Sequence, residues 1–575
     1  MTAVVKGADD SSPRWRHALL IGALLQALEE KKPNNVPFSL RNKLQGALVR
    51  ATNLALEDGQ GDPHSVANRA IVFLLNQSFR LLPESERWHI NYALLLPVLV
   101  ETVFSSNEGL EHGYWLGIID QDVREVRGKK FAWSANSPTF QLVQTMANRP
   151  LVTSLGPICR LIGHAVERIQ DPNILISILG RLSQFARTIA VSWRQNKLSE
   201  IDASEATNFL DAESIQTTTP ALWHILKLSL YAVIIILRSI TGRLLTDAAL
   251  GSDAHAPFVA IQALHLLRNM YFIASPMGQT STQPYAFVNM VALDILSRYP
   301  EQTQAFLQEI APPSQGQISA HPIDRNLDLF FLNTAEHLVP ILPPEFNQNV
   351  VLAAAVPYMK VQGSASLKEI FEAAHSATLS VLIAPQNEEL VSLQIPFYIE
   401  TLLSSFPGLL SSRQFRLAFR TLIRITSPPS MVAKTQPYLA AILLETVMQR
   451  AHDLSQSPVP TAKPTPDITN EETISDQAHL LMALIDSLCF LTPTLLEEWL
   501  PLTATAISYV EDSETRTLCY DRLWEAISGG EMDVERAALC VEWWSSNTIE
   551  KQIMQNGHVS QHSFPNPEAI VSSNK

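Results

Sequence analysis

Apolar residues recur at intervals of three and four along most of this chain, and this periodicity constrains the fold more than any other feature. In one typical stretch, Ile174, Ile178, Leu182 and Phe185 would share one face of an α-helix. Alternating apolar and polar residues bounded by turn signals, which would predict β-hairpins, are almost absent. The sequence therefore predicts a chain that is nearly all α-helical.

Prolines mark the positions where many of these helices are expected to begin. The 575 residues include 36 prolines and only 21 glycines. Proline is well tolerated at the first helical position, because the N–H that it lacks would have no partner there. Six prolines that precede apolar periodic stretches are predicted to start helices: Pro63, Pro172, Pro220, Pro257, Pro300 and Pro493.

The spacing of these prolines points to a repeat architecture. The intervals from Pro220 to Pro257 and from Pro257 to Pro300 are 37 and 43 residues, near the roughly 40-residue period of HEAT and armadillo repeats. A hairpin of two amphipathic helices cannot cover its own apolar face, so hairpins stack and share a core. We therefore predict an all-α fold, a HEAT/armadillo-like α-solenoid of stacked helical hairpins, although other helical bundles give similar patterns.

One low-complexity stretch divides the predicted solenoid. Residues 453–475 are rich in Pro, Ser and Thr, a composition typical of a flexible linker. The predicted organisation is a disordered N-terminus at 1–13, a helical solenoid at 14–452, the linker at 453–475, C-terminal helical hairpins at 476–545 and a disordered tail at 546–575.

Charge and hydropathy exclude several classes of protein. With 56 acidic and 42 basic side chains the net charge is −14, which disfavours sequence-independent nucleic-acid binding because phosphate neutralisation needs an excess of Lys and Arg. The most apolar run, Leu228–Leu237, has ten residues, whereas a bilayer-spanning helix needs about 20. We interpret this run as a helix buried inside the protein, with a membrane-embedded segment as the alternative, and we expect any membrane association to be peripheral.

The sequence carries no recognisable catalytic motif. It lacks GxxxxGK[ST], HExxH and GxSxG. Its densest polar cluster contains His321, Asp324 and Asp328, which would make a metal site only if the ligands converged. We favour helix capping by Asp324 and local pairing of Arg325 with Asp328. The prediction is a protein that is not an enzyme and that has no cofactor and no metal.

The most informative surface feature is a predicted arginine ridge, which consists of Arg413, Arg416, Arg420 and Arg424. At 100° per residue these side chains fall within roughly an 80° arc, opposite several apolar residues. Such a ridge suits an acidic partner segment or anionic lipid headgroups. The alternative is a solvated face, or one paired with carboxylates of the next helix.

Two adjacent tryptophans form a second candidate partner surface. Trp543 and Trp544 cannot both face one core on a helix, so at least one is predicted to be accessible to a partner. The alternative is a capping hairpin that closes the last face of the solenoid.

Five long segments have distinctive wording over their whole length rather than a catalytic signature. They are residues 320–339 (AHPIDRNLDLFFLNTAEHLV), 370–385 (IFEAAHSATLSVLIAP), 395–429 (IPFYIETLLSSFPGLLSSRQFRLAFRTLIRITSPP), 486–502 (DSLCFLTPTLLEEWLPL) and 528–544 (SGGEMDVERAALCVEWW). In these helical segments the chain resembles the fungal peroxin-eight family of the peroxisomal matrix-protein import machinery.

The resemblance implies a non-enzymatic scaffold in peroxisome biogenesis, bound peripherally to the lumenal face of the peroxisomal membrane. Such a protein would link the docking complex to the RING-finger complex and assist cargo release from the import receptor. The implied partners are the import receptor and the docking and RING-finger peroxins, without nucleic acid. The chain ends in Ser573-Asn574-Lys575, which is not a targeting tripeptide of the Ser-Lys-Leu type. The alternative function is a soluble HEAT-type adaptor in trafficking or chaperoning.

Overall fold

The computed structural model describes residues 14–30, 38–60, 62, 65–126, 128, 130–278, 283–313, 316–361, 365–454 and 474–546. The predicted disordered N-terminus, most of the predicted linker and nearly all of the predicted disordered tail lie outside these residues. The chain divides into two compact units, residues 1–334 and 335–575. The linker predicted at 453–475 therefore falls inside the second unit. The boundary between the two units lies about 120 residues earlier in the chain.

The first unit consists of amphipathic helices and one small β-hairpin. Its helices are α2 (Arg14–Glu30), α3 (Phe38–Asp58), α4 (Val66–Ser78), α5 (Glu84–Arg87), α6 (Tyr92–Val100), α7 (Trp115–Ile118), α8 (Pro138–Ala147), α9 (Pro150–Thr153), α10 (Leu155–Arg168), α11 (Pro172–Arg194), α12 (Ala206–Phe209), α13 (Thr219–Leu244), α14 (Ala256–Asn269), α15 (Tyr271–Ala274), α16 (Gln283–Leu296), α17 (Pro300–Ile310) and the larger part of α18 (Pro322–Leu338).

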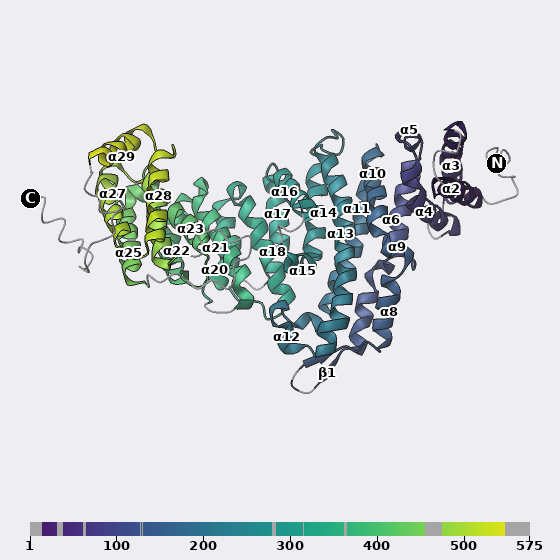
Figure 1. The fold of residues 1–575 in the computed structure, drawn as a ribbon, viewed down its shortest axis with the longest axis horizontal. Coiled ribbons are helices and arrows are strands. Elements are labelled where there is room, and N and C mark those ends of the chain that lie inside the picture. The colour runs from purple at the N-terminus through teal and green to yellow at the C-terminus, as the bar shows by residue number, and fades with distance from the viewer. Residues whose placement is uncertain are drawn as a thin grey trace, which may run out of the picture. The chain divides into compact units, whose positions relative to one another are not determined.

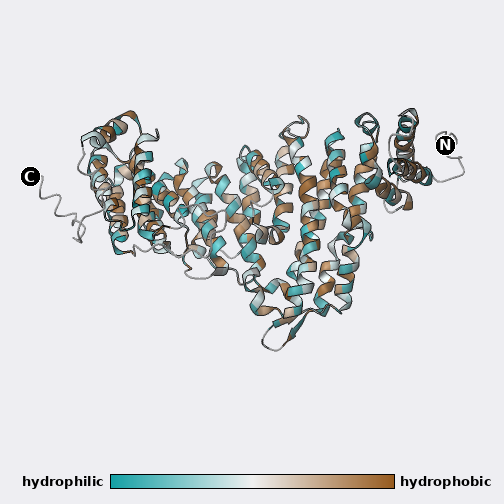
Figure 2. Ribbon diagram, in the orientation of Figure 1, coloured by the Kyte–Doolittle hydropathy of each residue, from teal (hydrophilic) through white to brown (hydrophobic). Residues whose placement is uncertain are grey.

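Helices of the first unit pack mainly on helices that lie two to four helices away in the chain. Helix α10 packs on α6, α13 packs on α10, and α16 packs on α13, while α14 packs on α11 and α16 (Figure 1). Apolar and hydrophilic residues alternate along the helices, as Figure 2 shows in brown and teal, so the apolar stripes of successive helices merge into one continuous core. The predicted all-α solenoid of stacked helices is confirmed.

Prolines start the helices as predicted, although the interval from Pro220 to Pro257 is not a helical hairpin. Pro172, Pro220, Pro257, Pro300 and Pro493 each occupy one of the first two positions of a helix, and Pro63 lies outside the described residues. The 37-residue interval after Pro220, however, holds the single 26-residue helix α13 and a loop. The expectation that this interval would be one helical hairpin is wrong, because α13 alone is as long as two average helices.

A β-hairpin interrupts the helical pattern, and the sequence did not predict it. Strands β1 (Arg124–Val126) and β2 (Lys130–Ala132) pair antiparallel, and they lie near α8 and α12 (Figure 1). Gly128 in the turn has a φ of 88°, a left-handed conformation that glycine adopts without steric cost. Both strands are three residues long, too short to give an alternating pattern.

The apolar run Leu228–Leu237 lies in the middle of α13. Seven of its ten residues are buried: Ser229, Leu230, Ala232, Val233, Ile234, Ile236 and Leu237. Helix α13 with the preceding turn, and also α11, are long and apolar enough to span a membrane by length and composition. The apolar run is much shorter than the helix that contains it, because the helix continues on both sides of the run through Lys227 and Arg238. Burial of the run against α10 and α16 agrees with the interpretation as a core helix.

The second unit is also all-helical in its described residues. Its helices are α19 (Pro344–Phe346), α20 (Ala353–Met359), α21 (Lys368–Ile383), α22 (Glu388–Ser405), α23 (Ser412–Thr426), α24 (Met431–Thr435), α25 (Leu439–Asp453), α26 (Asp476–Ser487), α27 (Pro493–Ser508), α28 (Ser513–Ser528) and α29 (Val534–Ser546).

Helix α26 occupies the centre of its neighbours. It packs on α23, α25, α27 and α28, and all of its residues after Asp476 are buried. A helix that is buried on every side is normally apolar all round. Helix α26 nevertheless carries Asp486 at 7% exposure, so this carboxylate needs partners inside the protein.

Candidate interaction surface

Local sequence signals set the position of α23, the helix that carries the predicted arginine ridge. The Ser411 Oγ accepts a hydrogen bond from the backbone N–H of Gln414 at 3.3 Å, and the Gln414 Oε1 accepts one from the backbone N–H of Ser411 at 2.9 Å. This capping box fixes the start of the helix. Phe415, Phe419 and Leu422 are buried at 1% exposure or less, so the opposite face of α23 carries the arginines.

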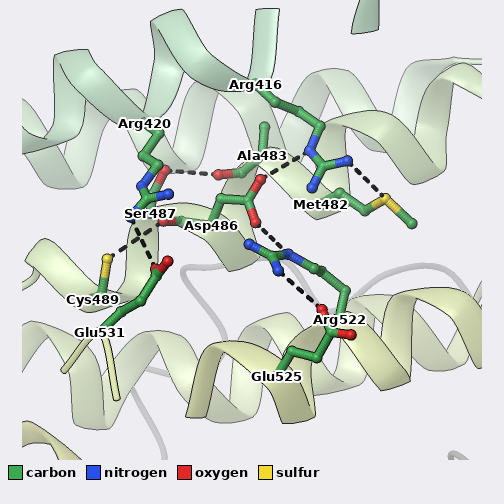
Figure 3. A network of polar contacts seen from close by, with 10 residues as sticks. All are labelled: Arg416, Arg420, Met482, Ala483, Asp486, Ser487, Cys489, Arg522, Glu525 and Glu531. Atoms are coloured by element: carbon green, nitrogen blue, oxygen red, sulfur yellow. Dashed lines mark hydrogen bonds and ion pairs between the residues drawn. The ribbon is translucent and has the colours of Figure 1, made fainter. Parts of the chain in front are cut away.

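Arg416 points inward, to the buried carboxylate of Asp486. Its Nε donates to Asp486 Oδ2 at 2.9 Å, while Arg522 Nε of α28 donates to Asp486 Oδ1 at 2.7 Å. Figure 3 shows the two guanidinium groups reaching the same carboxylate from α23 and α28. Arg522 also pairs with Glu525 at 3.0 Å. Three helices are thus joined through one carboxylate, which we call the Asp486 network (Arg416, Asp486 and Arg522).

Arg420 is also engaged inside the protein. Its Nη2 donates to Glu531 Oε2 at 2.9 Å (Figure 3). Its guanidinium also lies 5.3 Å from the ring centroid of Phe490, a cation–π geometry. Two of the four ridge arginines therefore have carboxylate partners on later helices or loops, which was the alternative interpretation of the ridge.

The other two ridge arginines form an exposed strip with a leucine between them. Arg413 and Arg424 are exposed, and Leu417 is 60% exposed. At 100° per residue the three side chains lie within an arc of about 40°. No ion pair of Arg413 or Arg424 is found within the described part of the chain. The exposed strip (Arg413, Leu417 and Arg424) is the part of the ridge that offers cations to a partner.

Trp543 and Trp544 lie in an aromatic cluster on the last two described helices. The ring centroid of Trp544 lies 4.8 Å from that of Trp524 and 5.4 Å from that of Tyr520, both on α28. Trp543 and Trp544 are half-buried, while Trp524 is 45% exposed. The cluster both packs α29 on α28, as a capping hairpin would, and leaves part of its aromatic surface in solvent.

The polar cluster at the start of α18 forms ion pairs with an earlier segment of the chain. Asp324 forms a bidentate ion pair with Arg194, whose second contact is 2.8 Å, and Arg325 donates to Asp202 at 3.2 Å. The sequence predicted only local interactions for these residues. No group of three or more His, Cys, Asp or Glu side chains that could hold a metal ion occurs among the described residues.

The carboxylate that pairs with Arg416 was not predicted, although the sequence contains a signal for it. Asp486 follows the run LLMALI and is the one acidic residue between Asp476 and Glu497. A lone carboxylate in so apolar a helix must be paired when it is buried. The arginines at helical spacing on α23 were the available cations.

Acid is expected to destabilise the second unit through a buried histidine. His375 on α21 is 5% exposed and both of its ring nitrogens lack a hydrogen-bond partner, and burial lowers its pKa to about 4. The imidazole of His375 binds a proton near pH 6.5 in the unfolded chain but not in the folded chain. The stability that depends on the neutral imidazole is therefore complete above pH 6.5 and is lost as the pH falls towards 4.

We expect the His375→Leu variant to be as stable as the unsubstituted chain at pH 7. When the pH falls from 7 to 4.5, its free energy of unfolding should decrease by about 2 to 3 kcal/mol less than that of the unsubstituted chain. Urea unfolding at both pH values measures the difference. His337→Leu, at an exposed position on α18, is the control. Equal acid sensitivity of the His375 variant and the unsubstituted chain would show that His375 does not carry this dependence.

Four family models together match most of the chain. They are described as the Peroxin 8 protein-like N-terminal domain (residues 1–87), the PEX8 helical domain (residues 135–280), the PEX8 central TPR-like domain (residues 303–383) and the PEX8 C-terminal domain (residues 389–556). The chain belongs to the Peroxin 8 family. The resemblance found in the sequence is thus confirmed, and the arginine ridge and the tryptophan pair both lie in the C-terminal domain of the family.

Curated relatives from yeasts agree with this assignment. The chain is 27% identical to the peroxisomal membrane protein PEX17 of Yarrowia lipolytica over 485 residues, which cover 79% of this chain and 68% of that protein. It is 22% identical to the peroxisomal biogenesis factor 8 of Komagataella phaffii and to that of Pichia angusta, with 72% and 59% of this chain covered. The chain spans 62% and 53% of those two relatives.

Solved structures of karyopherins were also matched. Importin beta is 12% identical, with 96% of this chain and 85% of that chain covered, at a TM-score of 0.26. Kap121p bound to Nup53p is 11% identical, with 96% and 68% covered, at a TM-score of 0.29. Likenesses at these scores add nothing to the assignment, which depends on the family models.

Proposed function

We propose that this Peroxin 8 family member is a non-enzymatic scaffold of peroxisomal matrix-protein import. In this role it links the docking and RING-finger complexes and assists cargo release from the import receptor, at the lumenal face of the peroxisomal membrane. Family membership is the observation that carries the proposal. The relatives named as peroxisomal biogenesis factors and as a peroxisomal membrane protein support the location.

The structure supports a scaffold by what its helices leave uncovered. In a stack of helices each element contacts only its neighbours, so long outer faces remain available to other polypeptides. The exposed strip of Arg413, Leu417 and Arg424 offers two cations beside an apolar side chain, a combination that suits an acidic segment or anionic headgroups. The second surface is the cluster around Trp524, Trp543 and Trp544.

The scaffold role is tested by native pull-down of the tagged chain from cells, read by mass spectrometry. The expected co-purified proteins are the import receptor, the docking complex and the RING-finger complex. Deletion of the gene is expected to leave matrix proteins in the cytosol. Normal import in the deleted strain would contradict the proposal. Recovery of coat, tubulin or nuclear-transport factors instead would favour the soluble adaptor, which the family assignment disfavours.

Loss of the exposed strip is expected to weaken this association without unfolding the protein. We expect Arg413→Ser with Arg424→Gln to reduce recovery of at least one partner, or of anionic vesicles, by about fivefold to tenfold, because two exposed cations are lost. The free energy of unfolding should change by no more than about 0.5 kcal/mol, the range of ordinary surface substitutions. Lys434→Gln, at an exposed position on α24, is the matched control. Unchanged recovery of every partner and of vesicles would remove the strip from the proposed surface.

A further inference from the structure

A cavity of about 280 Å³ lies in the first unit, and residues of α12, of α15 and of the first turns of α13 line it. Five separate stretches of the chain contribute side chains to it, from the end of α11 to the turn after α15. The lining residues used below are Trp193, Asp202, Ala206, Trp223 and Lys227.

The wall of the cavity is aromatic. The rings of Trp193 and Trp223 lie 5.9 Å apart in an edge-to-face arrangement. Phe272, behind them, stacks on Trp193 at 5.5 Å between ring centroids. Trp193 is 7% exposed and Trp223 is half-buried, so the cluster holds its rings rigidly while one edge still reaches the cavity. Rigid aromatic walls favour a bulky apolar or aromatic guest.

Two ion pairs hold the stretch from 194 to 202 against the start of α18. Arg194, next to Trp193, forms a bidentate pair with Asp324, and Asp202 accepts from Arg325 at 3.2 Å. The cavity is thus already shaped in the structure, and a guest would not have to order its wall. A preformed cavity costs a guest less ordering entropy on binding.

The charges at the cavity are not balanced. Both oxygens of Asp202 have partners, because Oδ1 accepts from Ser204 at 2.7 Å and Oδ2 accepts from Arg325. Lys227 is exposed, and no ion pair or hydrogen bond of its ammonium occurs within the described part of the chain. The charge available to a guest is therefore positive.

The size of the cavity limits the guest further. Sites that enclose a whole small-molecule ligand have volumes of roughly 300 to 1,000 Å³, and this cavity lies just below that range. It has room for one large side chain, with the rest of the guest outside. A single buried aromatic anchor is the usual energetic centre of a peptide interface.

We propose that this cavity binds an acidic peptide segment by taking in one bulky aromatic side chain, while a neighbouring carboxylate of the segment pairs with Lys227. The site is distinct from the exposed strip on α23 and from the tryptophan cluster of α28 and α29. The proposal does not depend on the scaffold role, because a peptide with these properties can be supplied on its own.

The test uses the full chain and a fluorescein-labelled peptide of twelve residues, with a central Trp flanked by two Glu on each side and with Gly and Ser elsewhere. Fluorescence anisotropy is expected to show saturable binding that weakens with added salt. Two further peptides, one with Ala in place of Trp and one with Lys in place of each Glu, should bind at least tenfold more weakly.

Two variants of the protein locate the binding. Ala206→Trp fills the cavity and is expected to reduce affinity by 30-fold or more, the effect of losing a buried anchor. Lys227→Glu is expected to reduce it by about tenfold, whereas Lys43→Glu, an exposed charge reversal on α3, should leave it unchanged. Circular dichroism checks the fold of each variant.

Absence of saturable binding by the Trp peptide would overturn the proposal, as would equal binding of the Ala or Lys peptide. Undiminished binding to a folded Ala206→Trp variant would place the peptide elsewhere and also overturn it. If that variant does not fold, Lys227→Glu decides, and equal effects of Lys227→Glu and Lys43→Glu would count against this site.

Discussion

Ile236→Lys is expected to unfold the first unit, whereas Tyr231→Lys, five residues earlier on the same helix, is expected to be tolerated. Ile236 has no exposed surface, and its helix α13 packs on α10 and α16. Tyr231 is 36% exposed. A lysine at position 236 would place an unpaired ammonium in an apolar core, which costs more than about 4 kcal/mol.

Thermal unfolding of the two variants measures this difference. We expect Ile236→Lys to remove the transition of the first unit or to lower its midpoint by more than 10 °C, and Tyr231→Lys to change it by a few degrees. Co-sedimentation with vesicles provides the second measurement. If Ile236→Lys folded normally but no longer bound vesicles, the apolar run of α13 would be a membrane-embedded segment, which was the alternative interpretation.

Loss of both arginines of the Asp486 network is expected to destabilise the second unit by about 3 to 5 kcal/mol. Asp486 is 7% exposed and accepts from Arg416 and Arg522. Removal of both cations leaves a buried carboxylate without a countercharge, the most costly way to break a buried ion pair. Either single substitution to Ala retains one partner, so we expect it to cost clearly less than half as much.

Chemical denaturation of Arg416→Ala, Arg522→Ala and the double variant gives a complete double-mutant cycle. We expect the double variant to lose more stability than the sum of the two single variants, because only the double variant leaves the carboxylate unpaired. The matched control is Arg413→Ala with Arg424→Ala, which removes two exposed arginines of the same helix and should cost less than about 0.5 kcal/mol. Equal losses of unfolding free energy for the two pairs of substitutions would show that the Asp486 network does not stabilise the protein more than exposed arginines do.

Periodicity and local start signals were sufficient to predict the fold class. Apolar residues at intervals of three and four depend only on the geometry of one helix. The capping box at Ser411 and Gln414 and the proline at the start of α11 depend only on the few residues around them. Such features can be found in a single sequence because their cause is local.

What could not be predicted depends on contacts between distant residues. The partner of Arg416 lies 70 residues later and the partner of Arg194 lies 130 residues later, and no spacing in the sequence encodes these pairs. The same holds for the cavity, whose tryptophans belong to different helices. For this reason the sequence indicated which residue types were available for a partner surface, but not which of the four ridge arginines remain exposed.

The enclosed position of α26 has a consequence for the synthesis of the protein. Helices α23 and α25 pack on α26, yet they are made before it, and residues 454–475 separate α25 from α26 in the chain. A nascent chain that has emerged only to α25 exposes the apolar faces that α26 later covers. Ribosome stalling between α25 and α26 would therefore leave a truncated chain with exposed apolar surface, a natural client for chaperones.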